Sequence, residues 1–173
     1  MAGQPTISLF FTDEATIPQA IARFFTRSWC SHVDVVMPNG ALLGARPNWE
    51  ANGGVQVRLP GYHDFTRSIA VELPCDAAVV NAFYAFCQEQ IGKPYDWRAD
   101  VMWFSSRDWS KPNSWMCSEL IAAGLVASGY FERLYVTASR ISPADLLLML
   151  STRVPIGALM PGIIFDKFEE NTK

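Results

Sequence analysis

The sequence has few of the residues on which metal centres and disulfide frameworks depend. Its 173 residues include two histidines and four cysteines, and no two cysteines form a CxxC pair. A structural zinc site uses four such ligands at short spacing, so we expect neither a metal nor another cofactor. The N-terminus carries no export signal, and we therefore expect the four thiols to be reduced rather than paired in disulfides.

The sequence also lacks an excess of positive charge and any long apolar run. Fourteen Lys and Arg against seventeen Asp and Glu give a formal net charge of −3. This weakly acidic balance argues against nucleic acid or an anionic membrane surface as a partner, because both attract basic proteins. Apolar runs such as 146–150 are far shorter than the roughly 20 residues that cross a bilayer. We expect a cytoplasmic protein with no transmembrane segment.

The sequence does contain enough apolar material for one folded domain. Hydrophobic residues make up 50% of the chain and charged residues 18%, which is unlike a disordered segment. The length is typical of a single domain, with a core expected over about 6–162 and a charged tail over 167–173. The composition permits a dimer but predicts no oligomeric state.

Short β-rich runs fill the first half of the chain, and helical patterns fill the second. Strands are predicted over 6–12, 31–37, 41–45, 55–59 and 67–73, with a tight turn at Asn39-Gly40. Helices are predicted over 18–27, 76–91, 117–128 and 142–150, followed by a closing strand over 154–160. Because strands come early and helices late, this order favours an α+β fold over a doubly wound parallel sheet.

Cys117 is the thiol best placed to be a nucleophile. It opens the helix predicted over 117–128, after the irregular segment 113–116. Free N–H groups at a helix N-terminus favour a thiolate and can bind an oxyanion beside the sulfur. The alternative interpretation is that Cys117 is a small buried residue of the core.

A nucleophilic thiol needs a base, and His32 is the first candidate. It begins the predicted strand 31–37 and shares one face of that strand with Asp34, so it could take the thiol proton and later protonate a leaving group. The alternative is a half-buried histidine of the sheet. Cys30 is a weaker rival nucleophile, because a side chain on the same strand does not normally point its sulfur at the imidazole. We expect His63 to be solvated in a loop.

Four short blocks occur in an order that resembles a known superfamily. They are 31–36 (SHVDVV), 92–96 (GKPYD), 115–120 (WMCSEL) and 140–146 (RISPADL). In papain-like enzymes the cysteine usually precedes the histidine, whereas here His32 precedes Cys117. This reversed order resembles the circularly permuted papain-like (NlpC-type) superfamily, and most closely its YiiX-like cysteine peptidases, over most of residues 6–150.

The resemblance implies an antiparallel sheet packed against the helix that carries the nucleophile Cys117, with His32 as the base. Members of the superfamily hydrolyse amide or ester bonds, or transfer acyl groups, through a thioester. Tyr95 matches a tyrosine near the nucleophile, where its hydroxyl would help to bind the oxyanion. The bland interpretation of Tyr95 is a core aromatic residue.

The chain departs from the superfamily at the residue that orients the imidazole. Relatives usually carry a polar residue, often Glu, on the strand after the histidine, and pairing through the turn puts Gly44 or Ala45 there. Neither side chain can orient an imidazole. The candidates for a third polar residue are Asp34, Glu50 and Gln56, with Arg46 also nearby. A backbone carbonyl or a water is a further possibility.

Tryptophans cluster before Cys117, and three of them are candidates for a substrate groove. Trp97, Trp103 and Trp115 would form an apolar wall if exposed, and core otherwise. The expected function is that of a cysteine peptidase or amidase, a thiol hydrolase that cleaves an amide bond in a peptide or peptidoglycan-like substrate. The alternatives are a lipid acyltransferase or esterase that acts on an acyl substrate with the same Cys–His pair, and a non-catalytic binding protein on the same scaffold.

Overall fold

The computed structural model describes residues 4–14, 28–47, 53–63, 65–96, 113–154 and 159–161, and the fold is given for these residues. The strands are β1 (Thr6–Glu14), β2 (His32–Val36), β3 (Leu42–Arg46), β4 (Gly54–Arg58), β5 (Phe65–Pro74) and β6 (Leu159–Pro161). They form one antiparallel sheet in the order β4-β3-β2-β1-β5-β6. The five early strands were predicted correctly. Of the closing strand predicted over 154–160, Leu159 and Met160 lie in β6, Val154 belongs to the bend after the preceding helix, and 155–158 lie outside the described residues.

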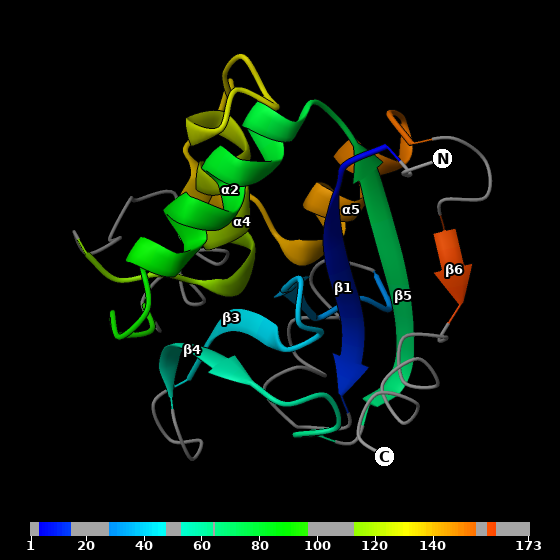
Figure 1. Ribbon diagram of the computed structural model, residues 1–173. Helices are drawn as coiled ribbons and strands as arrows, with labels where there is room; N and C mark the ends of the chain where they lie inside the picture. The colour runs from blue at the N-terminus through cyan, green and yellow to red at the C-terminus, as the bar shows by residue number, and fades with distance from the viewer. Residues whose placement is uncertain are drawn as a thin grey trace.

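Within the described residues, three α-helices follow the first five strands: α2 (Ala77–Glu89), α4 (Cys117–Ala127) and α5 (Pro143–Ser151), with a short 3-10 helix η1 (Ala138–Arg140) before the last. Helices α2 and α4 pack against each other, with α2 also against β1 and α4 against β2 and β3 (Figure 1). This arrangement confirms the α+β class. The helix predicted over 18–27 and the tail over 167–173 lie outside the described residues. Among the described helices, none combines the length and the apolar character needed to cross a membrane.

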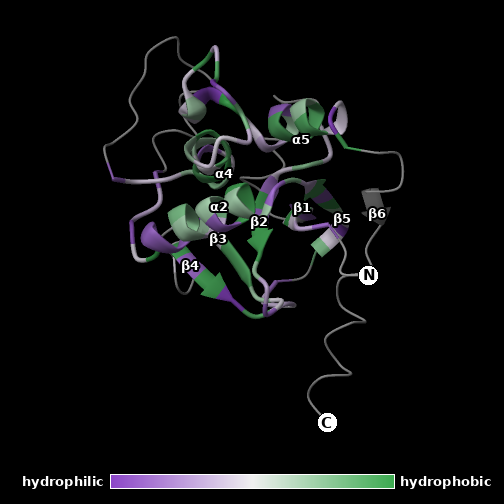
Figure 2. Cartoon of the chain, turned by 45° about the horizontal axis from the view of Figure 1, so that its top comes forward, coloured by the Kyte–Doolittle hydropathy of each residue, from purple (hydrophilic) through white to green (hydrophobic). Residues whose placement is uncertain are grey.

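Apolar side chains that alternate along the strands form one core with α2 and α4. Figure 2 shows hydrophobic residues along β2, β3 and β4, beneath the helices. The fully buried members of this core include Leu9, Val33, Val35, Leu43, Val71, Phe83, Leu120 and Ile121. Successive side chains of a strand point to opposite faces. The intervening positions of β2, His32 and Asp34, therefore share the other face of that strand.

The hairpin between β2 and β3 fixes which residues of the two strands face each other. The Met37 N–H donates to the Ala41 carbonyl (2.8 Å), and Gly40 takes the left-handed conformation (φ 83°) that a tight turn requires. The pairing runs Val36 to Leu42 and Val35 to Leu43. The next pair in the same register is Asp34 and Gly44.

Candidate active site

Cys117 occupies the first position of α4, as predicted. Its side chain is 5% exposed. The first turn is held on both sides, because the Ser118 hydroxyl donates to the Ile141 carbonyl (2.6 Å) and the Met116 N–H donates to Oε2 of Glu119 (3.2 Å). The thiol is thus mounted on a fixed turn, which is a requirement for a nucleophile that must approach one carbonyl carbon.

A short parallel bridge places Tyr95 beside the residues that lead into α4. It pairs Tyr95 with Trp115, through the Trp115 N–H to the Pro94 carbonyl (3.0 Å) and the Asp96 N–H to the Trp115 carbonyl (3.1 Å). Tyr95 is 8% exposed. The block 92–96 and the block that contains Cys117 therefore meet through this backbone bridge.

A glycine at the start of β4 admits the same segment to the sheet. The Val55 N–H donates to the Lys93 carbonyl (2.9 Å), and the Gly92 N–H donates to the Val55 carbonyl (2.8 Å). A Cβ on Gly54 would lie 2.7 Å from the Lys93 carbonyl oxygen, and the φ of Gly54 is +86°. Only glycine combines that conformation with that approach.

His32 and Asp34 form a buried pair on their shared face of β2. Nε2 of His32 lies 2.9 Å from Oδ1 of Asp34, and the two residues are 4% and 0% exposed. Of the two candidates for a third polar residue that the structure describes, Asp34 and Gln56, Asp34 is therefore the one that contacts the imidazole. The Gln56 amide instead donates to the Gly53 carbonyl (3.1 Å), and Glu50 lies outside the described residues.

The charges around this pair favour a protonated imidazole. Burial and the Arg46 guanidinium lower the pKa of His32, but the Asp34 carboxylate and Cys117 raise it more, and the resulting pKa is about 9. Burial alone would raise the pKa of Asp34, whereas His32, Arg46 and Tyr62 hold it well below its usual range.

Gly44 provides the space that the Asp34 carboxylate occupies. A Cβ at position 44 would lie 1.8 Å from Oδ1 of Asp34, so any other residue there would displace the carboxylate. The lack of a side chain at position 44 thus has a physical reason. The carboxylate beside the imidazole comes from β2, the strand that also carries His32, and occupies the space above Gly44 on β3.

Two further residues contact Asp34 directly or through one hydrogen bond. The Tyr62 hydroxyl donates to Oδ2 of Asp34 (2.7 Å), and Nε of Arg46 donates to the Tyr62 hydroxyl (2.6 Å). Sequence analysis named Arg46 without a role and missed Tyr62. A glycine inside a strand signals a close approach, so Gly44 could have pointed to Asp34, but nothing local marks a tyrosine after β4 as its partner.

Cys30 is buried and disfavoured as a nucleophile. It is 1% exposed, and its thiol donates to the His32 carbonyl at 3.5 Å. Burial and the nearby Cys117 raise the pKa of Cys30 far above its usual range. A thiol that stays protonated is a weak nucleophile, so Cys117 remains the candidate. All four cysteines are free thiols.

Trp115 packs against α2, the helix beside α4. Its ring lies 6.0 Å from that of Phe86 at 74°, and its indole N–H donates to Oε1 of Gln90 (3.1 Å). These contacts tie the approach to Cys117 to the end of α2. Trp97 and Trp103, the other two groove candidates, lie outside the described residues. Within the part of the chain that the structure describes, no group of three or more His, Cys, Asp or Glu could hold a metal ion.

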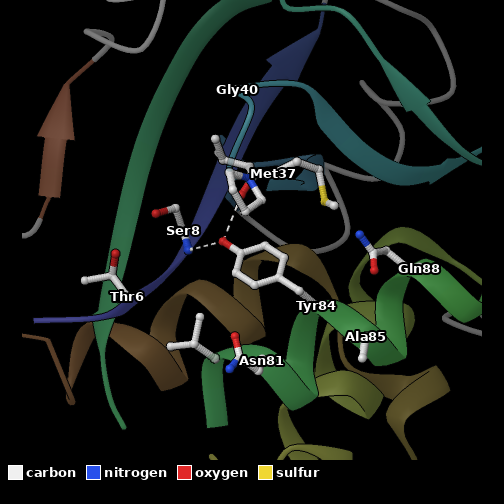
Figure 3. A pocket seen from close by; sticks show the side chains of 11 residues that line it. Thr6, Ser8, Met37, Gly40, Asn81, Tyr84, Ala85 and Gln88 are labelled. Atoms are coloured by element: carbon white, nitrogen blue, oxygen red, sulfur yellow. Dashed lines mark hydrogen bonds between the residues drawn. The ribbon is translucent and has the colours of Figure 1, made fainter. Parts of the chain in front are cut away.

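A groove of about 520 Å³ lies at the opposite end of β2, between the β2–β3 turn and α2 (Figure 3). Tyr84 stands in it, and the Tyr84 hydroxyl donates to the Val36 carbonyl (2.9 Å) and accepts from the Ser8 N–H (3.4 Å). The described residues that line the groove are uncharged and include no thiol or imidazole. The thiol Cys117 and the imidazole of His32 are thus not part of this groove.

No model of a known protein family and no curated protein matches the sequence. The described site comprises a thiol at a helix N-terminus, a buried imidazole whose pKa is raised in part by that thiol, and a carboxylate 2.9 Å from Nε2 of the imidazole.

Proposed function

We propose that the protein is a thiol hydrolase that cleaves an amide bond, on a circularly permuted papain-like scaffold. Cys117 is the nucleophile, His32 is the base and then the acid, and Asp34 holds the imidazole. The observation that carries the proposal is the buried contact of 2.9 Å between Nε2 of His32 and Oδ1 of Asp34. This contact leaves Nδ1 as the ring nitrogen for the thiol proton.

The reaction follows from these positions. The proton that Cys117 gives up is carried by Nδ1 of His32 as part of the imidazolium, and Sγ attacks the carbonyl carbon to give a tetrahedral oxyanion. The imidazolium then protonates the departing amine, and the C–N bond breaks to leave a thioester. In the second half, His32 takes a proton from water, the resulting hydroxide attacks the thioester, and the imidazolium returns the proton to the sulfur as the acid product leaves.

The oxyanion needs donors beside the sulfur, and the start of α4 supplies them. The N–H groups of the first helical turn have no partner within the helix. That of Met116 is already used by Glu119, so the N–H groups of Cys117 and Ser118 are the ones we assign. By the resemblance, the Tyr95 hydroxyl is a further donor, and the backbone bridge between Tyr95 and Trp115, two residues before Cys117, supports this assignment.

The contact between His32 and Asp34 also supports catalysis over a purely binding role. A non-catalytic scaffold was considered because the usual orienting position carries glycine. Asp34 supplies an orienting carboxylate from a different strand, and its buried charge favours the imidazolium that must form during the reaction. A protein that had lost catalysis would have no need to keep a buried charged pair, which costs desolvation energy.

The first test is the reactivity of each cysteine with iodoacetamide, measured by peptide mass spectrometry across pH. At pH 6 an ordinary thiol with a pKa of about 8.5 is almost wholly protonated. We expect Cys117 alone to be alkylated there, because the imidazolium of His32 stabilises its thiolate. His32→Ala should remove this reactivity, whereas His63→Ala, which deletes the other histidine, should leave it unchanged.

Two outcomes would count against the proposal. Alkylation of Cys30 in place of Cys117 would mean that the nucleophile is wrongly assigned. Four thiols that stay inert below pH 8 would mean that the scaffold carries no activated thiol. If Cys117 reacts as expected, a panel of fluorogenic amides and matched esters decides between amide cleavage and the esterase alternative.

A further inference from the structure

Three hydrogen bonds connect a buried arginine to the imidazole of His32. Nε of Arg46 lies 2.6 Å from the Tyr62 hydroxyl, that hydroxyl lies 2.7 Å from Oδ2 of Asp34, and Oδ1 of Asp34 lies 2.9 Å from Nε2 of His32. Arg46 is 1% exposed, although it carries a full charge. Placing a cation in the interior costs free energy unless the cation is hydrogen-bonded or paired, so the groups that Arg46 bonds are of interest.

The chemistry of the four groups fixes the direction of every bond in this series. A guanidinium can only donate, so the Tyr62 oxygen must accept from Arg46. The single hydrogen of the Tyr62 hydroxyl is then directed to Asp34. An ionised carboxylate can only accept, so Oδ1 must receive a hydrogen from Nε2 of His32. In a neutral imidazole with Nε2 protonated, Nδ1 carries the lone pair.

We propose that Tyr62 and Arg46 are positioning residues that fix the tautomer of His32, so that Nδ1 is the nitrogen that receives the Cys117 proton. The inference rests on the proposed function, because it assigns how the base is prepared. Both residues act through Asp34, whose carboxylate without them could rotate or accept from another donor.

The surroundings of Tyr62 restrict its ring as well as its hydroxyl. The Arg46 guanidinium lies 4.5 Å from the centre of the ring, and that of Arg58 lies 5.6 Å from it. Arg58 also donates to the carbonyl of Gly44 (2.9 Å), the residue over which Asp34 lies. The two arginines therefore restrain the ring of Tyr62 by cation–π contact. Arg46 also holds the Tyr62 hydroxyl, and Arg58 holds the Gly44 carbonyl, each by a hydrogen bond.

The tautomer can be measured directly by ¹⁵N NMR of the His32 ring. We would record the spectrum of the Cys117→Ala variant at a pH above the pKa of His32, so that only one ring nitrogen carries a proton. The parent should show the tautomer with the proton on Nε2. Adding Tyr62→Phe keeps the ring and its cation–π contacts but removes the hydroxyl, and a mixture of tautomers is expected. Tyr84→Phe removes another partly buried tyrosine hydroxyl, which bonds only backbone groups, and should leave the tautomer unchanged.

The second readout is the rate of Cys117 alkylation at pH 6 in the chain with its thiol. Tyr62→Phe should lower it by about tenfold, in line with the loss of one hydrogen bond to a charged group, with little change in the thermal unfolding temperature. Arg46→Gln should act in the same direction, because a glutamine oxygen can accept the Tyr62 hydrogen and turn it from Asp34. Arg46→Lys, which can only donate, should restore most of the rate.

The proposal is overturned by a proton on Nδ1 in the parent, or by an unchanged tautomer and an unchanged alkylation rate in both Tyr62→Phe and Arg46→Gln. The proposed function fails separately, through an unreactive Cys117 in the unmodified chain. The NMR result does not depend on that reactivity, so the two failures are distinguishable.

Discussion

A tyrosine hydroxyl from another part of the chain contacts each half of β2 and joins two groups there, but the groups that the two hydroxyls join differ in charge. At the end near Val36, Tyr84 bridges the Ser8 N–H and the Val36 carbonyl, which are neutral backbone groups. At the end near His32, Tyr62 bridges a cation and a carboxylate. A hydroxyl between backbone groups fastens a helix to a sheet, whereas one between ions also sets which atom carries a proton. The comparison separates a structural role from a chemical one on a single strand.

Asp34→Asn should have the largest effect of these substitutions, because it removes the charge that distinguishes the His32 end of β2 from the Val36 end. An asparagine amide can donate to the imidazole and favour the wrong tautomer, a change that costs about 10⁴-fold in a well-studied serine triad. We expect the rate of Cys117 alkylation at pH 6 to fall by at least about a hundredfold. Asn81→Asp, which places a carboxylate beside the uncharged groove, is the matched control. Equal rates in both variants would mean that Asp34 is only structural.

Gly44→Ala should disrupt the same end of β2 by a steric clash rather than by a change of charge. The added Cβ would lie 1.8 Å from Oδ1 of Asp34, so the carboxylate must leave its position and lose its partners. We expect the free energy of unfolding to fall by about 3 kcal/mol, since a buried charged group is left unsatisfied.

Gly92→Ala is the control for the glycine substitution. Gly92 has a φ of +87° and no heavy atom within 4 Å of an added Cβ, so alanine there should cost only about 1 kcal/mol of backbone strain. Urea denaturation measures both. A smaller loss in Gly44→Ala than in Gly92→Ala would show that Asp34 does not depend on the space above Gly44.

The pH dependence of stability sharpens the comparison. The folded-state pKa of His32 is raised to about 9 from an ordinary value of 6.5. The contribution of His32 to the free energy of unfolding is therefore complete below about pH 6.5 and is lost as the pH rises to 9. Linkage gives this contribution as on the order of 3 kcal/mol. We would measure the free energy of unfolding against pH for the unmodified chain and for His32→Gln. The difference between the two should shrink as the pH rises from 6.5 to 9, and a constant difference would contradict the raised pKa.

The strands and helices of the described chain were largely predictable from the sequence, because each has strong local signals. The turn at Asn39-Gly40 fixed one hairpin, and the helix over 143–151 begins with Ser142 and Pro143, where the Ser142 hydroxyl accepts from the Asp145 N–H (3.1 Å). These signals act over a few residues and depend little on the rest of the fold.

The orienting residue could not be chosen from the sequence, although the register that reveals it was derived. Gly44 was interpreted as a missing side chain, because a sequence shows what a residue lacks and not what fills the space. Tyr62 lies 28 residues from Asp34, and only the folded sheet brings them together. Long-range contacts between single polar atoms leave no periodic pattern, so they are the part of a site that sequence reasoning misses.

The close approach of Asp34 to Gly44 also makes positions 34 and 44 one exchangeable unit. Either strand can supply the carboxylate, provided that the other is bare where the two cross. A chain with a longer acidic residue at 44 and a small one at 34 would offer the imidazole the same charge from the other side. A side chain at 44 collides with Asp34, whereas a small residue at 34 only removes the carboxylate, so an evolutionary path between the two arrangements must alter both positions nearly together or pass through a form without the carboxylate.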